Sequence, residues 1–117
     1  MQDGRWAGTL PCNVFGPQTQ TTTTESSAIE LGDRGTARLA LTVVAVAGVA
    51  PTLDVALQTR HDATDPWRSL GAFAQATAPG TERKCFVGLD RFIRAIATIG
   101  VAPGASSFTF SVDGEAV

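Results

Sequence analysis

The chain has 117 residues and a net charge of −2, and 44% of its residues are hydrophobic, which excludes wholesale disorder. This length predicts one domain that buries about two-thirds of its unfolded surface, enough for a single core. Because basic residues are not in excess, we expect no nucleic-acid partner. The most apolar segment, residues 39–49, is too short to cross a bilayer, so we expect no membrane partner either.

The first 27 residues are predicted to form an extended N-terminal arm. Residues 18–27 are almost wholly polar, and such a segment has no hydrophobic face to pack on its own domain. We expect the arm to become ordered on a partner, as an added strand. A flexible tail, or a first edge strand of the same domain, is the alternative. The partner-binding residues of this arm would be Trp6, Leu10, Val14, Phe15, Thr21, Thr22, Thr23 and Thr24.

Residues 28–117 are predicted to form the folded domain, which begins with a short strand at 28–31. Residues 37–46 form the strongest central strand, because alternate positions are apolar. Near its end, at 43–46, both faces are apolar, which indicates burial on both sides or a contact in an oligomer. Residues 53–60 also alternate between apolar and polar, as in a half-buried strand.

Four further strands are expected in the second half of the chain, separated by turns that contain Gly, Pro or Asp. They are residues 67–73, 82–87, 91–99 and 107–112. Seven or eight strands with turns every 8–12 residues, and no helical periodicity, predict an all-β, antiparallel β-sandwich.

The predicted core takes its residues from the apolar face of these strands. Its members are Leu41, Val43, Val55, Leu57, Trp67, Ile93 and Phe110. The two cysteines, Cys12 and Cys85, are 73 positions apart. Because Met1 is followed by Gln2, Asp3 and Gly4 and not by a basic segment and an apolar run, we expect no secretory signal. Synthesis in the cytoplasm argues against a disulfide between them, and Cys85 is expected to be a small buried hydrophobe.

Two motifs in the second half resemble known β-sandwiches. Residues 65–73 read Asp-Pro-Trp-Arg-Ser-Leu-Gly-Ala-Phe, and residues 90–94 read Asp-Arg-Phe-Ile-Arg. Over residues 37–117 the pattern is similar to jelly-roll sandwiches of the galactose-binding-like (discoidin) type. It resembles more closely the small β-sandwich structural proteins of tailed double-stranded DNA phage virions. The resemblance implies a jelly-roll-like fold and a structural role, and no residue of these motifs is catalytic in either family.

The turn after residue 60 contains the one histidine, His61, together with Asp62 and Asp65. A catalytic histidine needs a nucleophile and an orienting acid, and no such motif accompanies it, so a polar residue at a strand end is expected. The two aspartates offer oxygens that Ca²⁺ prefers, but their spacing matches no EF-hand loop, and Asp is common in turns. We therefore predict no catalytic residue, no cofactor and no metal.

Trp67, Arg91 and Arg94 are the remaining candidates for a binding site. A tryptophan at a sandwich loop can stack on a sugar, but the chain has two tryptophans and no tyrosine, so it offers few aromatic groups for such a groove. We expect Trp67 to close one end of the core. The two arginines are expected to be structural, each pairing with a carboxylate for which Asp54 or Asp90 would serve.

These observations lead to a functional hypothesis of a non-enzymatic virion protein. It is expected to be a capsid decoration (cement) protein on the outer surface of the head, assembled in the host cytoplasm. Its partners would be the major capsid protein or other virion proteins, with homo-oligomers expected. The alternatives are a head–tail connector or tail protein, and a carbohydrate-binding module.

Overall fold

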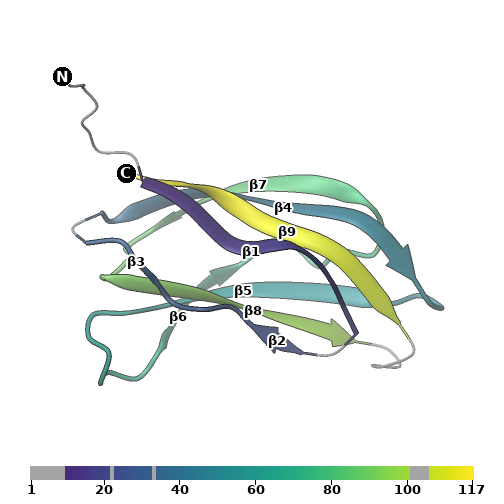
Figure 1. The fold of residues 1–117 in the computed structure, drawn as a ribbon, viewed down its shortest axis with the longest axis horizontal. Helices are drawn as coiled ribbons and strands as arrows, with labels where there is room; N and C mark the ends of the chain where they lie inside the picture. The colour runs from purple at the N-terminus through teal and green to yellow at the C-terminus, as the bar shows by residue number, and fades with distance from the viewer. Residues whose placement is uncertain (1–9, 22, 33, 101–105) are drawn as a thin grey trace.

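Two antiparallel sheets pack face to face in the computed structural model, which describes residues 10–21, 23–32, 34–100 and 106–117 (Figure 1). Within those residues the chain forms nine strands and no helix, and so none that could cross a membrane. The predicted all-β antiparallel sandwich is therefore confirmed.

The first sheet has the strand order β1-β9-β4-β7. Its strands are β1 (Leu10–Gln20), β9 (Ser107–Ala116), β4 (Thr36–Ala47) and β7 (Gly80–Val87). In the second sheet, β8 pairs with β5, β5 with β6, and two short strands, β2 and β3, both pair with β8. These strands are β2 (Thr24–Glu25), β3 (Ile29–Glu30), β5 (Thr52–Arg60), β6 (Arg68–Ala72) and β8 (Phe92–Gly100).

The strand pairs are nested along the chain, which is the arrangement of a jelly roll. β1 pairs with β9, β2 and β3 with β8, β4 with β7, and β5 with β6. Across the described ranges there are nine strands, where the sequence predicted seven or eight, because the chain between β1 and β4 pairs with β8 in two short pieces.

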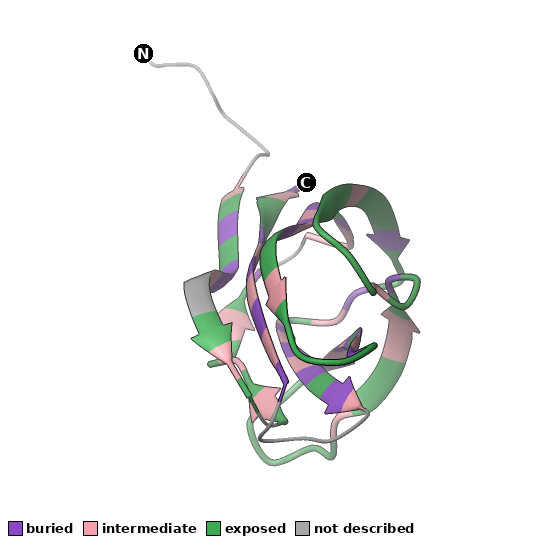
Figure 2. Cartoon of the chain, turned by 90° about the vertical axis from the view of Figure 1, so that its right-hand side faces the viewer, coloured by how far each residue is buried: buried purple, intermediate pink, exposed green. Residues whose placement is uncertain are grey.

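Buried and exposed residues alternate along the strands, as Figure 2 shows. The inward side chains of both sheets meet in one core, which includes edge-to-face pairs of Phe15 with Phe110 and of Phe73 with Phe86. Six of the seven predicted core residues are buried there: Leu41, Val43, Val55, Leu57, Ile93 and Phe110. The seventh, Trp67, lies elsewhere and is described below.

Residues 10–20 are part of the sandwich, which contradicts the predicted N-terminal arm. β1 pairs with β9 from Leu10 to Gln20, and Val14 and Phe15 are buried in the core of their own chain. The alternative of an edge strand is the correct one. Prolines are tolerated at the edge of a sheet, and two bulges in β1 shift its register, so that its apolar positions show no regular period.

The rest of the predicted arm also lies against the domain where the structure describes it. Thr24 pairs with Ala97 through β2, and the side chains of Thr21 and Thr23 are exposed. Trp6 and Thr22 fall outside the described residues. Because Val14 and Phe15 face inward, they are not free to anchor a partner.

The edge strands of both sheets are protected against pairing with another chain. β1 contains Pro11, Pro17 and its bulges, β7 contains three charged residues in a row, and the edge strands of the second sheet are short. Between β7 and β6 a side chain bridges the two sheets: Lys84 Nζ donates to the carbonyl of Ala72 at 2.7 Å. A partner therefore has better access to the sheet faces than to these edges.

Candidate functional site

The outer face of the first sheet forms an ordered grid of side chains. The register places outward residues of β7, β4 and β9 side by side in rungs, with Thr36 and Val117 joined by two main-chain hydrogen bonds. We call this surface the β4 face. From one end to the other its rungs are Val87–Thr36–Val117, Cys85–Arg38–Glu115, Arg83–Ala40–Asp113 and Thr81–Thr42–Ser111, and Val44 lies beyond them.

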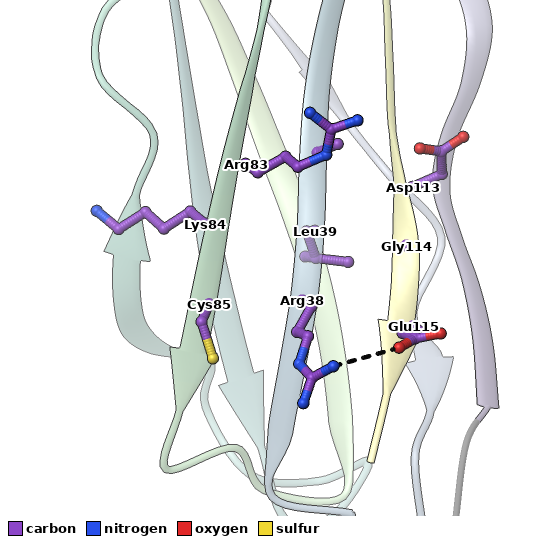
Figure 3. Close-up of a pocket in the computed structure, with 9 residues that line it drawn as sticks. Arg38, Leu39, Arg83, Lys84, Cys85, Asp113, Gly114 and Glu115 are labelled. Carbon is purple, nitrogen blue, oxygen red and sulfur yellow. Dashed lines mark ion pairs between the residues drawn. The ribbon is translucent and has the colours of Figure 1, made fainter.

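A shallow groove of about 550 Å³ crosses the β4 face near its charged end (Figure 3). Two small residues on neighbouring strands, Ala40 and Gly114, leave room for it. A side chain at Gly114 would overlap the backbone of Arg38, so only glycine fits this position. Lys84 points away from the groove, toward the Ala72 carbonyl to which it donates.

Charges of both signs flank the groove, and they are only partly paired. Arg38 Nη1 lies 3.7 Å from Glu115 Oε2, and both side chains are well exposed, so this ion pair contributes little to stability. Arg83 and Asp113 lie on either side of Ala40 in one rung. Neither forms an ion pair or a side-chain hydrogen bond with another described residue.

The β4 face also carries most of the exposed apolar side chains. Among the described residues four large hydrophobic side chains are exposed, and three belong to this face: Val44 (64%), Val87 (67%) and Val117 (38%). The fourth, Val49, lies in the turn after β4. Single exposed apolar residues are common, and these three are not contiguous, because Val87 and Val117 flank Thr36 at one end of the face and Val44 lies at the other. Together with the charged rungs between them, they make this face the candidate surface for contact.

The exposure of Val44 tests one prediction about β4. Apolar residues on both faces near 43–46 predicted either burial on both sides or a contact in an oligomer. Val43 is buried and Val44 is exposed, so burial on both sides within this chain is wrong. The contact in an oligomer stays a prediction.

Trp67 lies on the outer face of the second sheet, and the prediction that it closes the core is wrong. The guanidinium carbon of Arg60 lies 4.2 Å from the centre of the Trp67 ring, and that of Arg94 lies 4.5 Å from it. A guanidinium at this distance is attracted to the face of the ring, by about 0.5–2 kcal/mol per contact. The ring is half-buried beneath charged groups, which leaves less of it for stacking on a sugar.

Arg91 and Arg94 each pair with a carboxylate, as expected, but the carboxylates differ from those expected. Arg91 donates to Glu30 at 2.6 Å, and Arg94 donates to Gln58 at 2.8 Å and lies 3.4 Å from Glu25. These partners come from β2, β3 and β5, whose position beside β8 depends on the fold. The expected partners are used elsewhere: Asp90 pairs with Arg68, and Asp54 accepts from Gln75.

The turn with His61, Asp62 and Asp65 is exposed and is held by local hydrogen bonds. The Asp62 carboxylate accepts from the backbone N–H of Thr64 at 3.0 Å and from its hydroxyl at 3.1 Å. These hydrogen bonds, the backbone one first, lower the pKa of Asp62 below its usual range. Across the described ranges, no three His, Cys, Asp or Glu side chains are grouped closely enough to hold a metal ion.

The two cysteines are both free, and they lie in opposite environments. Cys12 is buried, its thiol donates to the Leu10 carbonyl at 3.6 Å, and burial raises its pKa. Cys85 is exposed in the groove, so the prediction that it is a small buried hydrophobe is wrong. β7 is an edge strand whose outward face no described residue covers, and sequence alternation in this charged segment did not reveal that orientation.

Sequence reasoning missed the grouping of Arg38, Arg83 and Asp113. Each is an ordinary charged residue on a polar strand position, and only strand register brings the three together.

In comparisons with known proteins, the chain matches no protein-family model and no curated protein.

Proposed function

We propose that this chain is a non-enzymatic structural protein of a tailed-phage virion, a capsid decoration protein on the outside of the head. The observation that carries the proposal is the β4 face, with its exposed valines and with Arg83 and Asp113, which pair with no other described residue. A surface of this kind favours contact with another protein surface.

The fold supports the same role by analogy. Jelly rolls with this nested strand order occur in viral capsid proteins and in lectins, so the fold agrees with the proposal without distinguishing between these classes. Protected sheet edges suit a protein that is packed at high local density, because they prevent edge-to-edge association with neighbouring copies.

The alternative of a carbohydrate-binding module depends on Trp67, because among the described residues its ring most resembles a platform on which a sugar could stack. Its ring is in contact with Arg60 and Arg94. A carbohydrate would have to displace or share these guanidinium groups, which makes sugar stacking less favourable. We therefore rank contact with another protein above sugar binding as the function of this chain.

The test is to add the purified chain to phage heads that lack it and to separate bound from free protein by sedimentation. Binding at a copy number comparable to that of the major capsid protein supports a decoration protein. Binding at the low copy number of a neck or tail ring would support the connector alternative instead.

Failure to bind any virion part would overturn the proposal. A glycan array, run in parallel with Trp67→Ala as the matched variant, tests the lectin alternative. Sugar binding that disappears in this variant would assign the chain to the carbohydrate-binding class.

A further inference from the structure

The order of residues across the β4 face is complementary to itself. On β7, at one side, lie Val87 and Arg83; on the β9 side of the same rungs lie Val117 and Asp113. Thus a cation faces an anion across Ala40, and a valine faces a valine across Thr36. Neither member of the charged pair has a partner within the described part of its own chain.

We propose that the β4 face binds a second copy of this chain about a two-fold axis that runs along β4. Such an axis places β7 of each copy over the β9 side of the other and keeps each rung opposite itself. Arg83 then meets Asp113 of the second copy, and Asp113 meets its Arg83. Two-fold contacts use the same patch on both subunits, which requires this kind of self-complementarity.

The same axis brings the exposed valines together. Val87 lies opposite Val117 of the second copy, and Val44, which lies on β4, meets its own counterpart near the axis. Packed sheets lie about 10 Å apart, which long side chains from both faces can span. Apolar contacts at both ends of the face would enclose the charge pairs and limit their exposure to water.

One feature of the face places like charges near the axis. Arg38 lies on β4 and would approach Arg38 of the second copy. Its guanidinium is turned toward Glu115 of its own chain, at 3.7 Å, and this carboxylate offsets the repulsion (Figure 3). The face is also narrow, because it consists of only the three strands β7, β4 and β9, and neighbouring strands are about 4.8 Å apart. We therefore expect a reversible dimer that depends on protein concentration.

The dimer would cover the same β4 face that is proposed above for virion contact, so the two occupants compete for it, and dimerisation is tested on the free chain in solution. Sedimentation equilibrium of the full chain should show a monomer–dimer equilibrium. Arg83→Asp or Asp113→Arg should each weaken dimerisation by about tenfold or more, because each places like charges opposite one another across the interface. Both residues lie on the outer face of the sheet, so the variants should fold normally.

A mixture of the two variants gives the decisive measurement. The Arg83→Asp chain has acids at both positions, and the Asp113→Arg chain has bases at both. Each pairs badly with itself and well with the other, so the mixture should form a heterodimer with about the affinity of the unmodified chain. Asp65→Arg, which reverses a charge in an exposed turn away from this face, is the control and should leave dimerisation unchanged.

Cys85 offers a second readout, because it is exposed on the β4 face while Cys12 is buried. Its alkylation should slow as the protein concentration rises. A chain that stays monomeric at its highest soluble concentration would overturn the proposal, and so would single variants that dimerise normally or a mixture that does not associate. Protection of Cys85 on phage particles alone would assign the face to a capsid protein and also overturn it.

Discussion

The two sheets of this sandwich share one core but differ in how their outer faces are completed. On the second sheet, Arg91 pairs with Glu30, and Arg94 contacts both Gln58 and the Trp67 ring. On the first sheet, three valines are exposed, and Arg83 and Asp113 pair with no other described residue. A face that satisfies its own charges has little to offer a partner, whereas the β4 face leaves its charges and valines uncovered.

The largest expected effect comes from removing residues 1–27, which include β1 and β2. The deletion exposes the β9 edge and removes Val14 and Phe15 from the core. Because a domain of this size is stable by only about 5–15 kcal/mol, we expect the truncated chain not to fold. Far-ultraviolet circular dichroism and thermal melting measure this. A melting temperature within a few degrees of the intact chain would restore the arm hypothesis.

Next in size is the loss of a core side chain on which both sheets depend. Leu57→Ala should reduce the free energy of unfolding by roughly 2–5 kcal/mol, because Leu57 is fully buried. The matched change on the β4 face, Val44→Ala, should alter it by less than about 0.5 kcal/mol in the monomer. Urea unfolding of both variants gives the comparison. Equal losses would show that Val44 is packed within its own chain.

A smaller effect is expected on the outer face of the second sheet, whose charges are paired. Trp67→Ala removes the ring that Arg60 and Arg94 contact and should cost about 1–2 kcal/mol, the range of partly buried cation–π contacts. Thermal and urea unfolding measure it. Trp67→Phe should recover part of the loss, since a smaller ring still accepts a cation. No change in stability for either variant would mean that this face is held by its ion pairs alone.

The smallest expected effect is a difference in chemistry between the two thiols. Cys85 should react with a maleimide rapidly at neutral pH, and Cys12 only as fast as the chain opens, because it is buried. Burial also raises the Cys12 pKa. Its folded-state pKa then lies above the unfolded value, so its contribution to stability is complete at neutral pH and is lost as the pH rises through that raised pKa.

Mass spectrometry of peptides after timed labelling reports each cysteine separately. Labelling at equal rates would show that β1 separates from the sheet. Cys12→Ser should remove the alkaline part of the stability profile attributed to this thiol.

Much of the fold could be predicted from the pattern of single strands. Alternation in residues 37–46, 53–60 and 107–112 predicted the correct elements and the correct inward faces, because side chains of a strand point alternately to its two sides. Alternation did not reveal β1, since its prolines and bulges interrupt the period. Trp67 was misplaced because a large aromatic group usually lies in a core, and the arginines that hold it come from other strands.

By itself, the sequence determined most of the strands and, in those that alternate regularly, which residues turn inward, since both follow from local alternation and from turn residues. Only the tertiary structure decided which strands are neighbours. That order sets the rungs of the β4 face and brings Arg83 and Asp113 to opposite sides of Ala40, although 30 positions separate them in the chain. Charge pairing acts over a few ångströms in space, so it depends on the register between distant segments, which no local pattern specifies.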